Sequence, residues 1–220
     1  MQLPFEQFPA LSAIGICRHV FTQRIPGIDV SHDKAEVLKR LDAAHREIRN
    51  AIGVGDWPLR TAEQIHGNKI AVVDSCSRGP VGRESPGCDG ILTNQRGVAL
   101  GVYVADCCAV YIVDPKTPAI GVVHSGRKGT ELGVVTNAIV QMIEQFGSKP
   151  RDLIVQLSPC IRPPHYEIDF AAKIIEQCCD QGVRKIHDSD VCTAGDLEHY
   201  YSYRAEKGRT GRMLALLGLK

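Results

Sequence analysis

The feature that most constrains the fold is the stretch from residue 98 to 129, VALGVYVADCCAVYIVDPKTPAIGVVHSGRKG, which contains two apolar, strand-like runs. The first run delivers Cys107 and the second delivers His124, both among polar residues. A thiol and an imidazole at the ends of adjacent buried strands can be held rigidly together, as two metal ligands or as a nucleophile and its base. We therefore expect this stretch to organise both the core and the functional site.

The bulk composition is that of an ordinary globular protein. With 220 residues, 44% of them hydrophobic, the chain can bury a full core, and we expect a single domain over residues 1–220. The net charge of +1 gives no general attraction to nucleic acid or to membranes, so neither is expected as a partner. The opening residues show no targeting pattern, and no apolar run approaches the roughly 20 residues that span a bilayer. A cytoplasmic address is the resulting expectation.

Hydrophobic spacing predicts three helices. The first starts at Ser31 or Asp33, with Glu36 completing a capping box after Asp33. The second spans residues 130–147, and Asp169 caps the third. Short apolar runs predict strands at residues 13–22, 70–73, 91–94 and 153–157.

The segment 75–90, SCSRGPVGRESPGCDG, is rich in glycine, proline, serine and charge. This composition predicts a long loop that acts as a lid or a binding loop. It brings Cys88 and Asp89 to the start of the next strand.

The strongest chemical constellation is the set His66, Cys107 and His124. Each residue stands at a junction of strand and loop, and together they form a mixed nitrogen and sulfur set suited to zinc. Three protein ligands leave a fourth position for water or substrate, which is the catalytic arrangement. The nine cysteines are an odd number without a disulfide framework, so most of the others are expected to be buried thiols.

A second interpretation makes Cys107 a nucleophile with His124 as its base. Asp106 is a poor candidate for the orienting third group, because side chains adjacent in a strand point to opposite faces. Both can reach one pocket only if the strand has already broken at Asp106. We expect Asp106 to anchor a turn or to support the site indirectly.

A third interpretation is a phosphate loop. Gly121 and Gly126 have the spacing of a Walker A motif, but Arg127 and Lys128 follow where the motif requires lysine and then serine or threonine. This mismatch excludes a nucleotide triphosphatase. Phosphate binding at the start of the 130–147 helix, helped by Lys128, remains an expectation.

Six motifs carry a family resemblance that runs in order from about His19 to the end of the chain. They are QIHG at 64–67, CDGILTN at 88–94, ADC at 105–107, HSGRKG at 124–129, SPCIRPPHYEI at 158–168 and YYSYRAEKGRTGRM at 200–213. This series resembles the YfiH family, the laccase-domain or multicopper polyphenol oxidase group later reassigned as purine nucleoside phosphorylases.

The resemblance implies a fold, a metal and an activity. The fold is α/β (α+β), with mixed sheets flanked by helices in one YfiH-like domain. In the family, the residues matching His66, Cys107 and His124 bind one zinc ion. The implied activity is phosphorolysis of adenosine, inosine and methylthioadenosine, with adenosine deamination alongside, so the partners are a purine nucleoside and phosphate. Copper and phenol oxidation are the older assignment, and too few imidazoles converge here for a multicopper centre.

The chain departs from the family pattern beside the metal set. Arg127 stands where the family motif HAGWRG has an indole, and Lys128 stands where it has an arginine. Lys128 can meet phosphate as a point charge but lacks the bidentate fork of arginine. Arg46 is a remnant of a shortened N-terminal pattern. These differences concern substrate contacts and leave the metal set intact.

The leading hypothesis is therefore a zinc-dependent purine nucleoside phosphorylase. Cys107, His124 and Lys128 are its candidate catalytic residues, and Arg46, Arg127 and Lys128 its candidate phosphate-binding residues. The alternatives are a cysteine hydrolase or amidase that uses Cys107 and His124 on cell-wall precursors, a copper-dependent polyphenol oxidase, and a metal-stabilised binding module without activity.

Overall fold

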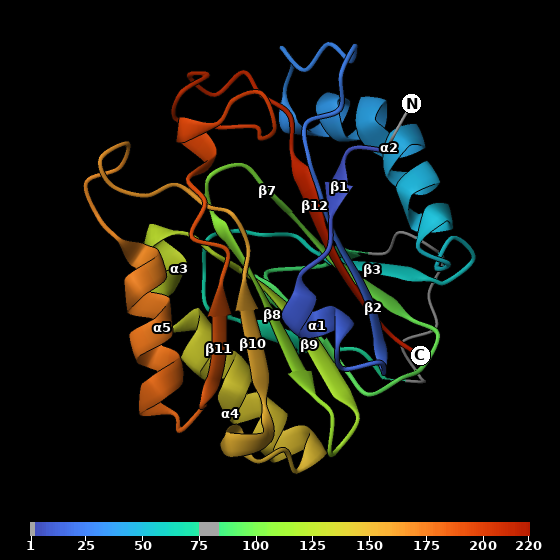
Figure 1. The fold of residues 1–220 in the computed structure, drawn as a ribbon, viewed down its shortest axis with the longest axis vertical. Helices are drawn as coiled ribbons and strands as arrows, with labels where there is room; N and C mark the ends of the chain where they lie inside the picture. Colours follow the sequence, from blue (N-terminus) through green and yellow to red (C-terminus); the bar gives the residue numbers. More distant parts are fainter. Residues whose placement is uncertain (1–2, 75–83) are drawn as a thin grey trace.

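Two six-stranded sheets form the centre of the computed structural model, which describes residues 3–74 and 84–220 (Figure 1). The first sheet has the order β1-β2-β12-β7-β3-β5, built from Phe5–Glu6, Cys17–Thr22, Met213–Leu219, Ala99–Val104, Leu59–Ala62 and Glu84–Ser85. The second has the order β11-β10-β8-β9-β6-β4, built from Lys185–Asp188, Ile154–Leu157, Cys108–Asp114, Ala119–Ser125, Gly90–Thr93 and Ile70–Val72. Each sheet contains parallel and antiparallel pairs, which confirms the expected α/β fold with mixed sheets.

Strands β8 and β9 are continuous apolar runs because both of their faces are buried. Tyr111 and Val113 of β8 pack into the cluster that joins the two sheets, whereas Val110 and Ile112 pack with the helices on the other side. This alternation follows from the two-residue period of a strand. The hydroxyl of Tyr111 donates a hydrogen bond across the interface to the carbonyl of Val20, at 2.8 Å.

The stretch 98–129 contains three strands rather than the two runs expected from the sequence. Strand β7 belongs to the first sheet, and β8 and β9 pair antiparallel in the second. The chain crosses between the sheets at residues 105–107, where Asp106 has a φ of 82°. Cys107 therefore lies at a sheet-to-sheet crossing, a feature that hydrophobic patterning does not encode.

The first and third predicted helices are confirmed, including their caps. Helix α2, Lys34–Ala51, is capped by the Asp33 side chain, which accepts a hydrogen bond from the Glu36 amide at 3.0 Å. Helix α5, Phe170–Asp180, is capped in the same way by Asp169. Figure 1 places α2 on one side of the molecule and α3, α4 and α5 on the other.

The predicted helix over 130–147 is instead two helices. Helix α3 spans Arg127–Glu131 and α4 spans Val134–Phe146, and the break lies at Gly133, whose φ of 72° is left-handed. Helix α4 packs on β9, β6 and β4, and also against α5. The long helix therefore starts at Val134, and the HSGRKG turn leads into the short helix α3 instead, so the predicted long-helix N-terminus does not lie at that turn.

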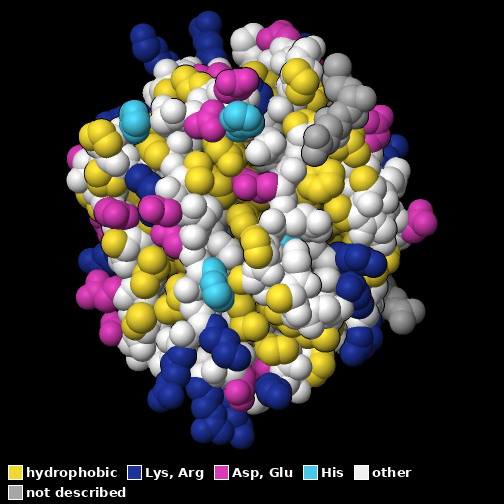
Figure 2. Space-filling model, viewed as in Figure 1, with side chains coloured by type: hydrophobic (Ala, Val, Ile, Leu, Met, Phe, Trp, Pro, Cys, Tyr) yellow, Lys and Arg dark blue, Asp and Glu magenta, His cyan; other side chains and the backbone are white. Residues whose placement is uncertain are grey.

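The remaining short elements are helix α1, Pro9–Ser12, and 3-10 turns at Pro150–Asp152 and Thr193–Gly195. Of the loop expected at 75–90, residues 75–83 lie outside the described part of the chain. No helix in the described residues has the length and apolar character needed to cross a membrane. Figure 2 shows side chains of both charges on one face, with Lys and Arg densest along its lower edge.

Candidate metal centre and its cavity

His66, Cys107 and His124 come together, as the sequence predicts. One potential ligand atom from each lies within 4.8 Å of the others. His66 lies in the turn before β4, Cys107 directly precedes β8, and His124 is near the end of β9. The β8 and β9 register pairs Ala109 with His124, which brings the neighbouring Cys107 to the same edge.

A fully buried carboxylate, Asp89, orients the His124 imidazole and holds the backbone of the turn that carries His66. Its Oδ1 accepts hydrogen bonds from the His66 amide at 2.8 Å and from Nδ1 of His124 at 2.9 Å, and its Oδ2 accepts from the Gly67 amide at 2.6 Å. Because Nδ1 of His124 is occupied, Nε2 is left as its ligand atom. Asp89 belongs to the CDG motif, but the sequence alone did not predict its contacts with His66 and His124.

The electrostatics of the site favour a thiolate. Burial by itself raises the pKa of Cys107, but His124 and His66 outweigh this effect and bring the pKa to about 6. Burial lowers the pKa of His124, and Cys107 and Asp89 reverse this and raise it to about 9. Without a metal, the pair is therefore thiolate and imidazolium at neutral pH, and the thiolate is the form that binds metal.

Three residues that line the site have left-handed backbone conformations: Gln64, His66 and Asp106, with φ values of 66°, 60° and 82°. Such conformations cost energy in residues other than glycine, so the surroundings must hold them. The Gln64 amide does so by exchanging hydrogen bonds of 2.6 and 2.9 Å with the backbone of Tyr103. A Cβ at Gly126 would lie 2.5 Å from the Cys107 sulfur, so this position requires glycine.

Asp106 anchors the loops around the site, as expected. Its carboxylate accepts hydrogen bonds from the Thr193 hydroxyl at 2.8 Å and from the Arg204 amide at 2.7 Å. Its carbonyl accepts from the Ile161 amide at 2.8 Å. Because the strand has broken at this residue, Asp106 and Cys107 line the same cavity.

The site opens into a cavity of about 500 Å³. Its walls combine aromatic rings with cationic side chains, an arrangement suited to a planar base and an anion. The aromatic residues are Tyr103, Tyr166, Phe170 and Tyr203, and the cations are Lys34, Arg127, Arg204 and Arg212.

Of the three cations proposed from the sequence, Arg127 lines the cavity. Arg46 lies on α2, exposed and paired with Asp42 at 2.5 Å, and Lys128 is exposed on α3. Neither belongs to the cavity wall. Because α3 begins at Arg127, the next side chain, Lys128, is rotated about 100° around the helix axis and does not reach the cavity. The cavity also contains Arg204 and Arg212, which belong to a basic stretch of the sequence for which no phosphate contact was predicted.

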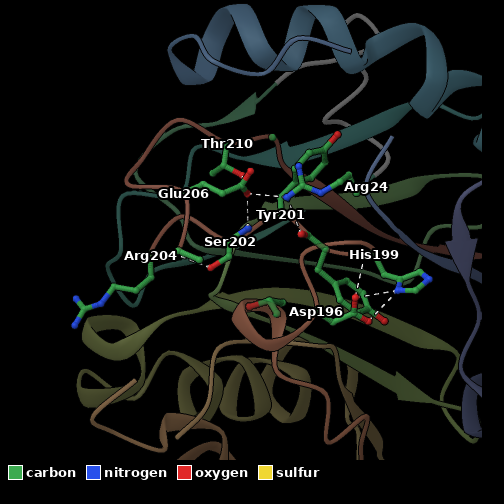
Figure 3. Close-up of polar contacts among 12 residues, drawn as sticks. Arg24, Asp196, His199, Tyr201, Ser202, Arg204, Glu206 and Thr210 are labelled. Carbon is green, nitrogen blue, oxygen red and sulfur yellow. Dashed lines mark hydrogen bonds and ion pairs between the residues drawn. The ribbon is translucent and has the colours of Figure 1, made fainter. Parts of the chain in front are cut away.

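A polar cluster fixes the loop that carries Tyr203, Arg204 and Arg212 (Figure 3). Oε2 of Glu206 accepts hydrogen bonds from Nη2 of Arg24 at 2.8 Å and from the Ser202 amide at 3.0 Å. In Figure 3 the side chain of Arg204 extends away from this cluster. The cluster thus fixes the loop, and the Arg204 side chain takes no part in it.

The fold and the site define a class of protein. It is an α/β protein with three potential metal ligands in a cavity lined by aromatic and cationic side chains. The chain matches the family described as multi-copper polyphenol oxidoreductase laccase over residues 13–181 and 167–220. It belongs to that family, which confirms the resemblance read from the six motifs.

Relatives of the chain are named as purine nucleoside phosphorylases. The chain is 29% identical to purine nucleoside phosphorylase YlmD of Bacillus subtilis, over 94% of its own length and 85% of the relative's. It is 30% identical to a purine nucleoside phosphorylase of Streptomyces griseus, over 86% and 84% of the two chains. The crystal structure of YlmD from Geobacillus stearothermophilus superposes with a TM-score of 0.85, covering 100% of both chains at 22% identity, and shows the same fold.

Proposed function

We propose that the chain is a zinc-dependent purine nucleoside phosphorylase that acts on adenosine, inosine and methylthioadenosine, with adenosine deamination at the same site. The observation that carries the proposal is the convergence of His66, Cys107 and His124 within 4.8 Å in the 500 Å³ cavity. The names of the relatives support the reaction class.

The donor set fits zinc. Two imidazoles and a thiolate are typical zinc ligands, and a three-donor set leaves one position open. Asp89 fixes the orientation of His124, as carboxylates next to metal-binding histidines commonly do. Zinc held there would supply a Lewis acid that polarises a substrate or water oxygen. Copper is less suited, because the described residues bring together one group of three donors rather than a multicopper cluster.

The chain's own residues would bind and orient the two substrates. Tyr103, Tyr166 and Tyr203 would supply aromatic surface for a purine, and Arg127 and Arg204 would supply guanidinium groups for phosphate. Phosphorolysis breaks the bond between purine and ribose and joins the ribose carbon to a phosphate oxygen, while the purine nitrogen takes up a proton. The reaction therefore needs a cavity with aromatic and cationic side chains in its lining, and this cavity has both.

The test is direct. Purified protein incubated with adenosine and orthophosphate should release adenine and ribose 1-phosphate, and Cys107→Ser should abolish the release. Cys179→Ser is the matched control, because Cys179 is an exposed thiol on α5 away from the cavity. Equal activity of Cys107→Ser and the parent would refute the proposal.

A cysteine hydrolase or amidase is the second candidate. It is favoured by one observation, the Cys107 thiol with a pKa of about 6 beside His124, which is the arrangement of an activated nucleophile. Active protein free of metal and inhibited by iodoacetamide would select this candidate. Loss of activity on chelation, restored by zinc, would select the phosphorylase.

A further inference from the structure

One carboxylate, Glu167, bridges two cavity arginines. Its Oε1 lies 3.6 Å from Nη1 of Arg127, and its Oε2 lies 3.4 Å from Nη2 of Arg204. All three side chains are about half exposed, at 53%, 49% and 61% respectively. Arg127 is also paired with Glu131 of its own helix, at 3.0 Å between Nε and Oε1, so Glu167 is the carboxylate that contacts both arginines, with one oxygen for each.

The three residues come from separate segments that meet at the cavity. Arg127 opens α3, Glu167 precedes α5, and Arg204 lies in the loop braced by Glu206. Tyr166, next to Glu167, lies under Arg204, with 5.4 Å between the guanidinium carbon and the ring centroid. The arginine pair therefore stands beside an aromatic face inside the same cavity.

The wall of the cavity is rich in positive charge. Among the described residues that line it, Asp106 is the one carboxylate, against four Lys or Arg side chains. Both oxygens of Asp106 are engaged by neutral donors, the Thr193 hydroxyl and the Arg204 backbone amide. Glu167 is not part of the wall and reaches the arginines from its edge.

We propose that Arg127 and Arg204 form a binding site for a phosphoryl dianion, and that Glu167 is an internal competitor which the ligand displaces. A phosphoryl group carries more charge than a carboxylate and offers three oxygens to two guanidinium groups. Exposed ion pairs contribute little stability, so displacement of Glu167 costs little. Glu167 keeps the arginines in place until the ligand arrives.

The dianion has two sources with the same chemistry. It is either orthophosphate, the second substrate of the proposed reaction, or the phosphate of a purine nucleotide whose base lies among the aromatic residues of the cavity. The inference thus deepens the proposed function, but binding can be measured without turnover.

Titration calorimetry of orthophosphate into the full chain tests the site. Arg127→Gln should weaken binding about tenfold, the loss expected for a charge-assisted hydrogen bond. Glu167→Gln should tighten binding about threefold, because the competitor loses its charge. Circular dichroism verifies that each variant is folded.

Matched controls lie on α2. Arg40 makes the same kind of contacts as Arg127, with a Glu36 partner four residues away at 2.8 Å and a second carboxylate, Asp29, at 3.2 Å. Arg40→Gln and Glu36→Gln should leave phosphate binding unchanged. If Arg127→Gln binds phosphate as Arg40→Gln does, or if Glu167→Gln does not tighten binding, the inference is wrong.

Adenosine and adenosine 5′-monophosphate separate the two sources. If the site serves a nucleotide, the monophosphate binds more tightly than adenosine, and Arg127→Gln removes that difference. If it serves orthophosphate, the two ligands bind alike, and Arg127→Gln raises the KM for orthophosphate. Folded protein that binds phosphate in this pattern but does not cleave nucleosides would rule out the phosphorylase and support the phosphate site. An active phosphorylase that Arg127→Gln does not affect would support the phosphorylase and rule out the site.

Discussion

His19 and His124 are both buried, with 1% and 4% of their surfaces exposed, yet their charges differ. His19 lies in β2 against Phe8, whose amide donates a 2.7 Å hydrogen bond to Nε2, and burial lowers the pKa of His19 to about 4. Burial acts on His124 in the same direction, but Cys107 and Asp89 raise its pKa to about 9. The comparison shows that the neighbouring charges, rather than burial, decide what a buried histidine does.

The two regions therefore have different tasks. The His19 region is a packed interior in which a neutral ring accepts one hydrogen bond. The His124 region contains a thiol and a carboxylate that are tolerated because they are held in contact with the imidazole. The groups that could bind a metal are therefore concentrated in the second region.

The largest expected effect is a loss of folding stability at acidic pH, caused by protonation of His19 on unfolding. Because the folded-state pKa of His19 is about 4 and the unfolded-state pKa is about 6.5, the unfolded chain binds more protons between these values. Stability should therefore fall as the pH drops from about 6.5 to 4, by about 3 kcal/mol from this residue. His45, with a pKa lowered by burial to about 4, should act in the same way.

Urea denaturation at pH 7 and pH 4.5 measures this loss. His19→Gln should lose less stability between the two pH values than the parent does, whatever its stability at pH 7. An equal loss in both proteins would show that His19 is not kept neutral by the fold.

A smaller effect is expected at Asp89. Asp89→Asn keeps the shape but removes the charge that orients Nδ1 of His124, and loss of such a carboxylate typically weakens metal binding about 10- to 100-fold. Competition with a chromogenic chelator measures the zinc affinity.

Asp114→Asn is the control for this change, since Asp114 is equally buried but accepts hydrogen bonds from the Lys116 and Thr117 amides at a turn. If both variants bind zinc equally well, Asp89 has no role in the metal site.

The sequence predicted the parts of the molecule that depend on local chemistry. The caps at Asp33 and Asp169 follow from neighbouring residues, and the donor types of His66, Cys107 and His124 predict a metal site. The break between α3 and α4 at Gly133 could not be predicted, because the spacing of apolar residues continues across it. The role of Asp89 and the bridge from Glu167 to Arg127 depend on segments distant in sequence, which patterning does not pair.

The sequence also could not predict which of the candidate phosphate-binding side chains faces the cavity. Whether Lys128 or Arg127 faces the cavity depends on where α3 begins, and a shift of one residue rotates a side chain by about 100°. The replacement of the family's indole by Arg127 was visible in the sequence, whereas its contact with Glu167 required the structure.

Elemental analysis of the untagged protein, compared with its Cys107→Ser variant, tests the central claim most directly. We predict about one zinc ion per parent chain, and marked loss of zinc from the variant, because the thiolate is one of three ligands. Parent protein without bound metal that still cleaves adenosine in the presence of a chelator would contradict the account.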